Sequence, residues 1–241
     1  MVTNRHVIYD LSESEIEPYE VAINIRNAQG TAPAEWREFV LNQNEIRDRV
    51  YVHADPDVDI AIIDISDLIR NLPTTIRSLN SDDLIDVHEM INVECSDDVL
   101  VVGYPMGFFD AQNIFPIVKR GIVASGWGLK WNGEPFFLVD VKLFPGSSGS
   151  VVLTKPVDHL LIGGKIHHSP GGKQYAVLGI YSGEPYVGEG DSEETIDVGI
   201  VWYASLLPEI ISGKVRWSSS IKPSVSISSL VRPTRRKLVA N

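Results

Sequence analysis

The sequence predicts a mainly β protein, on the basis of two observations. Short runs rich in Val, Ile, Phe and Tyr recur along the chain, with turn-forming residues between them. This pattern is typical of sandwiches and barrels rather than of alternating strand–helix units. The chain has 241 residues, of which 44% are hydrophobic, so it can bury a sizeable core. Its length suits one large domain or two small barrels packed together.

The predicted strands fall into two groups. The first group lies at 19–26, 37–43, 50–54 and 59–65, and the second at 99–104, 114–124, 135–142, 149–154, 176–182 and 198–203. Between the groups, 66–98 mixes Asp, Asn and Ser with scattered leucines, which is typical of a loop-rich connection. We therefore expect two units at 1–95 and 96–213, followed by a tail at 214–241.

A closing helix is predicted after the last strand. Residues 204–211 place apolar side chains at helical spacing, and Ser205 stands where an N-cap is needed. Pro208 suits a first turn, and Gly213 is a stop signal.

The charge of the chain is unevenly distributed. The formal net charge is -11, yet 214–241 contains basic residues and no acidic one. An acidic body repels phosphate backbones, so nucleic acid is not expected as a partner. The basic, Ser-rich tail is expected to be solvated or to dock on the protein itself, and a nucleic-acid arm is the alternative.

The sequence offers few signals about location. No apolar run reaches the length of a membrane span, and no secretory signal follows Met1 as written. The single cysteine, Cys95, cannot form an internal disulfide. The lack of a visible secretory signal and the single cysteine favour the cytoplasm. The alternative is that Met1 is an internal residue of a longer protein. Nothing indicates the oligomeric state.

A serine in a tight turn is the first candidate for chemistry. Gly146, Ser147, Ser148 and Gly149 lead directly into a predicted strand. Such a turn can point a hydroxyl outward while amides behind it converge on a developing oxyanion. Ser148 is the candidate nucleophile, and the turn Gly146 to Ser148 is the candidate oxyanion hole, with Gly146 and Ser148 as donors. The alternative is a flexible turn or linker.

A serine nucleophile needs a base, and the base needs a carboxylate that orients it. His6 is the candidate base, and a structural histidine is the alternative. Asp59 is the candidate acid because it opens an apolar run that would bury its surroundings. The competing carboxylates, Asp55, Asp57 and Asp64, are expected to be solvated or structural.

Three segments together resemble the triad motifs of bacterial trypsin-like serine peptidases, in the order His, Asp, Ser of the chymotrypsin class. The segments are Val2-Thr3-Asn4-Arg5-His6, Asp59-Ile60-Ala61-Ile62 and Gly146-Ser147-Ser148-Gly149-Ser150. Further similar segments lie at 101–107, 116–122, 178–183 and 199–211. The resemblance implies two antiparallel β-barrels of chymotrypsin type with a C-terminal helix.

The resemblance also implies a function. It predicts a serine endopeptidase that hydrolyses a peptide or protein substrate through an acyl-enzyme and needs no metal or organic cofactor. Tyr181, Ser182 and Gly183 fall on the strand that pairs with a bound substrate in this family. Lys142 and the pair His167 and His168 lie where they could approach the specificity pocket and favour acidic side chains, and plain surface charges are the alternative.

The sequence departs from the family pattern at three places. Only a few residues precede His6, so the first barrel is expected to be incomplete, with low stability or a strand recruited from elsewhere. Ser147 replaces the aspartate of zymogen-activated members, and Ser150 replaces a commoner glycine.

Two other functions remain as alternatives. One is a catalytically impaired trypsin-like scaffold that binds peptides or proteins. The other is an α/β-hydrolase esterase, which the order of acid and base disfavours.

Overall fold

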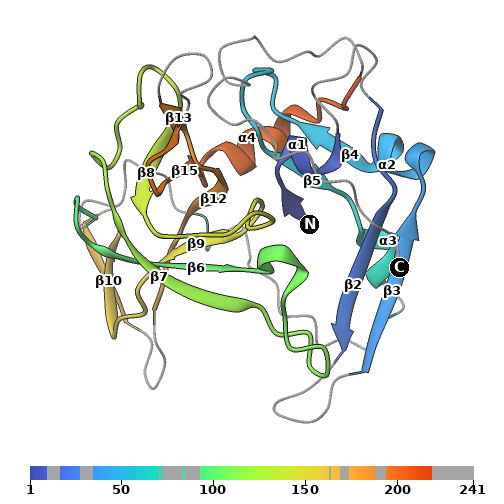
Figure 1. The fold of residues 1–241 in the computed structure, drawn as a ribbon, viewed down its shortest axis with the longest axis horizontal. Coiled ribbons are helices and arrows are strands. Elements are labelled where there is room, and N and C mark those ends of the chain that lie inside the picture. The colour runs from blue at the N-terminus through green and yellow to red at the C-terminus, as the bar shows by residue number, and fades with distance from the viewer. Residues whose placement is uncertain are drawn as a thin grey trace.

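The computed structural model describes residues 1–9, 17–27, 35–70, 72, 84, 93–162, 164–168, 174–187 and 194–218. It is mainly β, with one closed antiparallel barrel, several incomplete sheets and a short C-terminal helix (Figure 1). The predicted fold class is therefore confirmed. Most of the predicted connection at 66–98 and of the Ser-rich tail lies outside the described residues, and the predicted domain limits stay a prediction.

The second half of the chain builds the closed barrel. Its strands are β6 (Asp98–Gly103), β7 (Ile117–Val123), β8 (Phe136–Asp140), β9 (Val151–Thr154), β12 (Val177–Gly183) and β15 (Val198–Tyr203). They follow the order β12-β15-β8-β7-β6-β9, and the pairing of β9 with β12 closes the ring. All six strands overlap strands predicted from the sequence.

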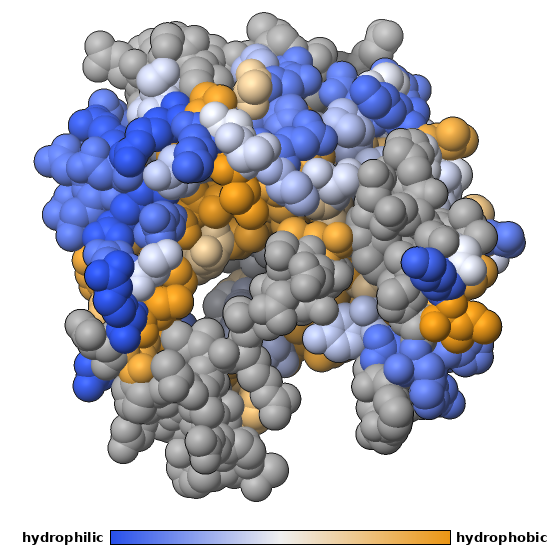
Figure 2. Space-filling view, turned by 180° about the vertical axis from the view of Figure 1, so that it is seen from behind, coloured by the Kyte–Doolittle hydropathy of each residue, from blue (hydrophilic) through white to orange (hydrophobic). Residues whose placement is uncertain are grey.

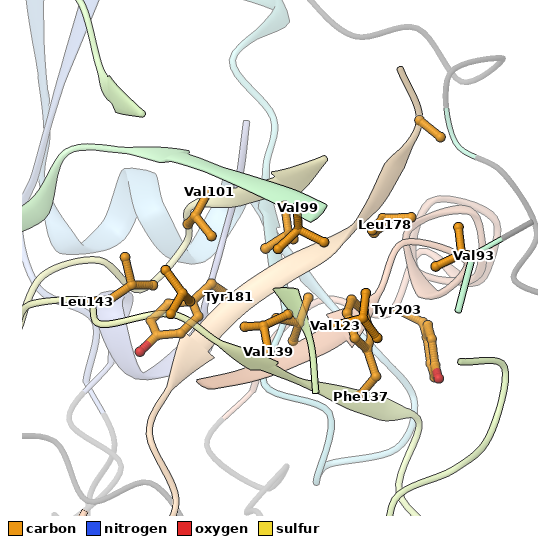
Figure 3. Close-up of a cluster of buried hydrophobic side chains, with 14 of the residues drawn as sticks. Val93, Val99, Val101, Val123, Phe137, Val139, Leu143, Leu178, Tyr181 and Tyr203 are labelled. Carbon is orange, nitrogen blue, oxygen red and sulfur yellow. The ribbon is translucent and has the colours of Figure 1, made fainter. Parts of the chain in front are cut away.

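The barrel encloses a core of branched aliphatic and aromatic side chains. In β6, buried and half-buried residues alternate along the strand, as expected when one face points inward. Figure 3 shows Val99, Val101, Val139 and Phe137 converging between the strands. The ring of Phe137 contacts the rings of Trp127 and Tyr203 at 5.0 and 5.2 Å. This packing fills the interior of the barrel.

The first half of the chain builds smaller sheets. Strands β1 (Val2–Thr3), β5 (Ala61–Ile63) and β4 (Val50–Val52) form one three-stranded sheet, and β2 (Val21–Asn27) pairs with β3 (Glu35–Leu41). Helix α2 (Gln43–Arg49) follows β3 and begins with a capping box between Asn42 and Glu45. Within the described residues, these sheets do not close into a barrel.

The segment after the C-terminal helix adds to the open sheet. Val52 N donates to Val215 O at 2.9 Å, and Trp217 N donates to Val50 O at 3.4 Å. The Trp217 ring stacks on Tyr9 at 4.2 Å and is largely buried in the core of the first half. The start of the predicted tail thus lies along β4 and pairs with it through the bridge between Tyr51 and Arg216. Such a segment from elsewhere in the chain is what an incomplete first barrel was expected to recruit.

The remaining elements are short. They are α1 (Arg5–Ile8), α3 (Ser66–Ile69), the 3-10 turn η2 (Pro105–Gly107), β10 (His159–Ile162), β11 (Lys165–His168), β13 (Tyr186–Val187), β14 (Glu194–Thr195) and α4 (Leu206–Gly213). Helix α4 is the predicted closing helix, although Gly213 lies inside it and Lys214 forms its left-handed C-cap. Ser205 stands at the N-cap without a side-chain cap bond.

A third cluster of buried side chains joins the two halves. Val58 and Ile60 from the first half pack with Ile180 and Trp202 from the barrel and with apolar residues of α4, including Leu206. On the face opposite to that of Figure 1, hydrophobic residues gather around a central hollow (Figure 2).

No helix among the described residues has the length and hydrophobicity that crossing a bilayer requires.

Candidate active site

His6 lies on α1, the single helical turn that follows β1. Its Nδ1 is 2.6 Å from Asp59 Oδ2, and its Nε2 is 2.9 Å from Ser148 Oγ. The three predicted residues therefore meet, with the imidazole between the carboxylate and the hydroxyl. Burial disfavours the protonated imidazole, but the charge of Asp59 and its hydrogen bond outweigh this and raise the pKa of His6.

Asp59 lies in the loop between β4 and β5 and is almost completely buried. Its carboxylate accepts the His6 backbone N–H at 3.1 Å and the Ser182 hydroxyl at 2.6 Å, besides the bond from the imidazole. Burial by itself would raise the pKa of Asp59, but the charge of His6 and the hydrogen bonds from His6 and Ser182 hold it below its ordinary value. Asp59 is therefore ionised at neutral pH and can stabilise a protonated imidazole.

Ser148 lies in the turn that precedes β9. Gly146 and Gly149 on either side have φ values of 84°, a region that favours glycine. A Cβ on Gly149 would also lie 2.8 Å from Thr3 Oγ1 of β1, so the turn and β1 approach each other closely. Ser148 Oγ is 2.9 Å from Ser182 O as well as from the imidazole, so its one proton has two acceptors.

The three residues predicted for the oxyanion hole differ in their backbone bonds. Ser147 N donates to Phe144 O at 3.0 Å and is already engaged. For Gly146 N and Ser148 N, no acceptor is found in the described part of the chain. The assignment of Gly146 and Ser148 as the donors of the oxyanion hole stays a prediction.

Ser150, the departure from the commoner glycine, is accommodated by a neighbouring strand. Its side chain is buried, and a Cβ on Gly103 would lie 1.8 Å from Ser150 Oγ. Gly103 at the end of β6 therefore leaves the space that the larger residue needs. Sequence reasoning did not connect these two positions, because they are far apart in the chain and meet only where β6 pairs with β9.

The predicted substrate-binding residues lie in different environments. Lys142 is exposed, and its carbonyl accepts a hydrogen bond from Lys119 Nζ. The Tyr181 side chain is 3% exposed inside the barrel core. Its backbone is engaged as well, because Tyr181 N donates to Ser150 O and Tyr181 O accepts from Gly149 N, both at 2.9 Å. Ser182 is buried against Asp59 and Ser148, and Gly183 ends β12 beside a register shift. These assignments stay predictions.

The histidine pair singled out with Lys142 lies on the β10–β11 hairpin. His168 Nδ1 lies 3.1 Å from Asp158 O, which precedes the start of β10. The His167 side chain lies outside the part of the structure that is described.

The competing aspartates have structural bonds of their own. Asp55 Oδ1 accepts Asp57 N at 3.0 Å within the loop, and Asp64 Oδ1 accepts Ser66 N at 2.9 Å at the start of α3. Neither of these bonds involves the imidazole of His6.

Sequence reasoning missed two residues and one role. Asn4 Nδ2 donates to Asp59 O at 2.7 Å, and Arg5 donates to Pro56 O. Both belong to the segment that precedes His6, and that position was the available signal. Ser182 was assigned to substrate binding, and its hydroxyl bond to Asp59 could not be inferred from separate segments. Among the described residues, no group of His, Cys, Asp and Glu is placed to hold a metal ion.

Comparison with known proteins gives a family and matches to solved structures at low sequence identity. The chain matches the HtrA-type protease AlgWS227A with decapeptide at 18% identity and a TM-score of 0.41, over 83% of this chain and 52% of that one. It matches the MamO protease domain from Magnetospirillum magneticum in its apo form at 15% identity and a TM-score of 0.40, over 86% of this chain and 79% of that one. The chain thus spans about half the length of the HtrA-type protein.

No curated protein matches the chain. The family model that describes a trypsin-like peptidase domain matches residues 1–163, which is well over half of the sequence. The resemblance noted from the three motifs therefore has independent support, and the chain belongs to the family of trypsin-like peptidase domains.

Proposed function

We propose that this protein is a serine endopeptidase that cleaves peptide bonds through an acyl-enzyme, with Ser148 as nucleophile, His6 as general base and Asp59 as the orienting carboxylate. The observation that carries the proposal is the unbroken chain from Asp59 Oδ2 through His6 to Ser148 Oγ, with contacts of 2.6 and 2.9 Å. Membership of the trypsin-like peptidase family supports the same reaction class.

The first step makes the acyl-enzyme. Ser148 Oγ attacks the scissile carbonyl carbon while His6 Nε2 takes the hydroxyl proton. The tetrahedral intermediate then collapses, the C–N bond breaks, and the imidazolium gives its proton to the leaving amine. Asp59 fixes Nδ1–H toward itself, so that Nε2 carries the lone pair that the proton transfer needs.

The second step releases the acid product. Water attacks the ester of Ser148, His6 removes a proton from the water, and the imidazolium returns that proton to Ser148 Oγ. In both steps the negative oxygen would be stabilised by the amides of Gly146 and Ser148, and losing one such donor typically costs about 3 to 4 kcal/mol of transition-state stabilisation.

A serine-reactive fluorophosphonate tests the proposal directly. The wild-type protein is expected to be labelled at Ser148, and peptide mapping of the adduct would locate it. Ser148→Ala removes the labelled atom, and His6→Ala removes the base, so both variants are expected to lose labelling. Ser212→Ala is the matched control, because Ser212 lies exposed on α4 and bonds only to Glu209 O among the described residues.

The same experiment distinguishes the proposed peptidase from the alternative, a scaffold that binds peptides. Wild-type labelling no faster than that of Ser148→Ala would refute catalysis by this chain and favour a peptide-binding scaffold. In that case, binding of peptides to the unlabelled protein would be the next measurement. Labelling followed by cleavage of a denatured protein substrate, and loss of both in the two variants, would support the peptidase.

A further inference from the structure

One buried charge of the first half takes no part in the reaction described above. Arg5 precedes His6 in α1, and its side chain is only 1% exposed. A guanidinium that leaves water destabilises a fold unless acceptors and anions surround it. The groups around Arg5 therefore indicate what the buried charge does.

Those groups belong mainly to the loop that carries Asp59. Arg5 Nη1 donates a hydrogen bond to Pro56 O. Burial lowers the pKa of Arg5, and the charge of Asp59 opposes this most strongly, followed by Tyr9 at the C-cap of α1 and then by Asp57 and Asp55.

The same loop faces a further carboxylate from the barrel. Glu134, in the turn between β7 and β8, has a raised pKa because of burial and because of the charges of Asp55 and Asp57. The loop between β4 and β5 therefore concentrates negative charge, and the guanidinium of Arg5 is the cation buried beside it.

Three consecutive residues hold this loop at three points. Asn4 Nδ2 donates to Asp59 O at 2.7 Å, Arg5 donates to Pro56 O, and His6 donates to the Asp59 carboxylate from its backbone at 3.1 Å. The loop cannot shift relative to His6 without breaking at least one of these bonds.

We propose that Arg5 is a positioning residue of the active site, which anchors the loop at Pro56 and offsets the negative charge of its aspartates, so that Asp59 stays aimed at His6. Arg5 acts through Asp59 and touches no reacting atom. The inference rests on the proposed function, because it assigns Arg5 a task in the same site.

The proposal predicts the direction in which the protonation of His6 and Asp59 shifts when Arg5 is replaced. His6 and Asp59 are in direct contact and take up protons as a coupled pair. Removing a nearby cation lets the pair take up a proton at higher pH. The acid limb of activity, which reports loss of the neutral base, should therefore move to higher pH in Arg5→Met, by about one unit, the low end of what a neighbouring charge causes.

Two substitutions separate the charge of Arg5 from its shape. In Arg5→Met, kcat should also fall by about 10 to 100-fold with KM nearly unchanged, the size of loss that a small misplacement of a reacting group causes. Arg5→Lys keeps the charge but lacks the planar fork, so kcat should fall while the midpoint of the acid limb stays at its wild-type value. Arg49→Met is the control, because Arg49 of the same half binds Asp64 O and Asp67 instead.

A titration of His6 by NMR, carried out in the Ser148→Ala background, measures the same shift without an activity assay. The His6 midpoint should rise in Arg5→Met by about one unit and stay unchanged in Arg5→Lys and Arg49→Met. If wild type is not labelled by fluorophosphonate, the proposed function fails, yet this titration still decides the role of Arg5.

A folded Arg5→Met with wild-type kcat and midpoint would overturn the proposal. So would a loss of kcat that only follows the unfolded fraction measured by circular dichroism, with an unchanged midpoint, since this is what a merely structural residue would give. If Arg5→Met does not fold, Arg5→Lys decides: a reduced kcat in a folded protein supports the proposal, and a wild-type kcat contradicts it.

Discussion

The two halves of the molecule cover the edges of their β-sheets in different ways. In the second half, six strands close on themselves, and each strand has a neighbour on both sides. In the first half, β1, β5 and β4 form a sheet whose β4 edge is covered by the segment 215–217, and Trp217 fills the core beside Tyr9. Closure in the barrel comes from continuous pairing, whereas the first half depends on a segment from the other end of the chain.

The candidate site takes residues from both halves. Ser148 and Ser182 come from the closed barrel, whereas His6 and Asp59 come from the open half. Because local opening requires less free energy where backbone pairing is incomplete, we expect the base and the acid to be the more easily disturbed part. The following variants test this comparison.

Phe137→Ala should give the largest loss, because it removes a fully buried ring that contacts Trp127 and Tyr203 inside the barrel. The expected cost is about 3 to 5 kcal/mol in the free energy of unfolding. Urea denaturation followed by circular dichroism measures it. Leu129→Ala, at a side chain that is 66% exposed, is the control and should change little. A cost below about 1 kcal/mol would show that the barrel is not the stable half.

Trp217→Ala should act on the first half. It removes the stack on Tyr9 and part of the core beside β4, with an expected cost of about 3 kcal/mol, the low end for a large aromatic residue at the edge of a core. Hydrogen exchange of the amides in β4 and β5 should accelerate more than exchange in β6 and β15. Trp131→Ala, at an exposed tryptophan, is the control. Equal acceleration in both halves would contradict the comparison.

Ser182→Ala should weaken the contact between the halves. It removes the hydroxyl that donates to Asp59 at 2.6 Å, and a bond to a charged group is typically worth about 1.5 to 3 kcal/mol. Because this bond helps to hold the pKa of Asp59 below its ordinary value, its stabilisation is present at neutral pH and is lost as pH falls through that lowered pKa.

Denaturation series at several pH values measure this effect. The difference in unfolding free energy between wild type and Ser182→Ala should shrink toward acid pH, whereas Ser212→Ala should match wild type at every pH. A difference that stays constant with pH would mean that the hydroxyl does not stabilise the ionised form of Asp59.

Asn42→Ala should give the smallest effect, confined to the first half. Asn42 Oδ1 accepts the N–H groups of Asn44 and Glu45 at the start of α2, and losing such a cap costs about 1 kcal/mol. Thermal melting gives the total, and hydrogen exchange shows whether the loss stays in α2. Asn44→Ala is the control, since it keeps both backbone donors. A loss of protection in the barrel strands would mean that the halves unfold together.

The sequence predicted the barrel strands well because their pattern is local. Runs such as β6, with alternating buried residues, and β15, which is almost wholly buried, carry their strand signal within a few residues. The closing helix was predicted for the same reason, since its spacing and its first-turn proline are local features. The family was recognised from three short motifs.

Two elements were missed although signals were present. Helix α2 begins at Gln43, where the strand was expected to end, and the capping pair Asn42 and Glu45 marked that start. The hairpin of β10 and β11 turns at Gly164, within a segment where no strand was predicted. In both cases the signal is a cap or a turn only a few residues long.

The sequence by itself determined the fold class, the family and the three segments that carry His6, Asp59 and Ser148, because each depends on neighbouring residues. Only the tertiary structure decided that 215–217 covers the β4 edge, that Ser182 donates to Asp59, and that Arg5 is buried against Pro56. These contacts join residues far apart in the chain. No local pattern encodes them, because the geometry that brings such residues together exists only after the chain has folded.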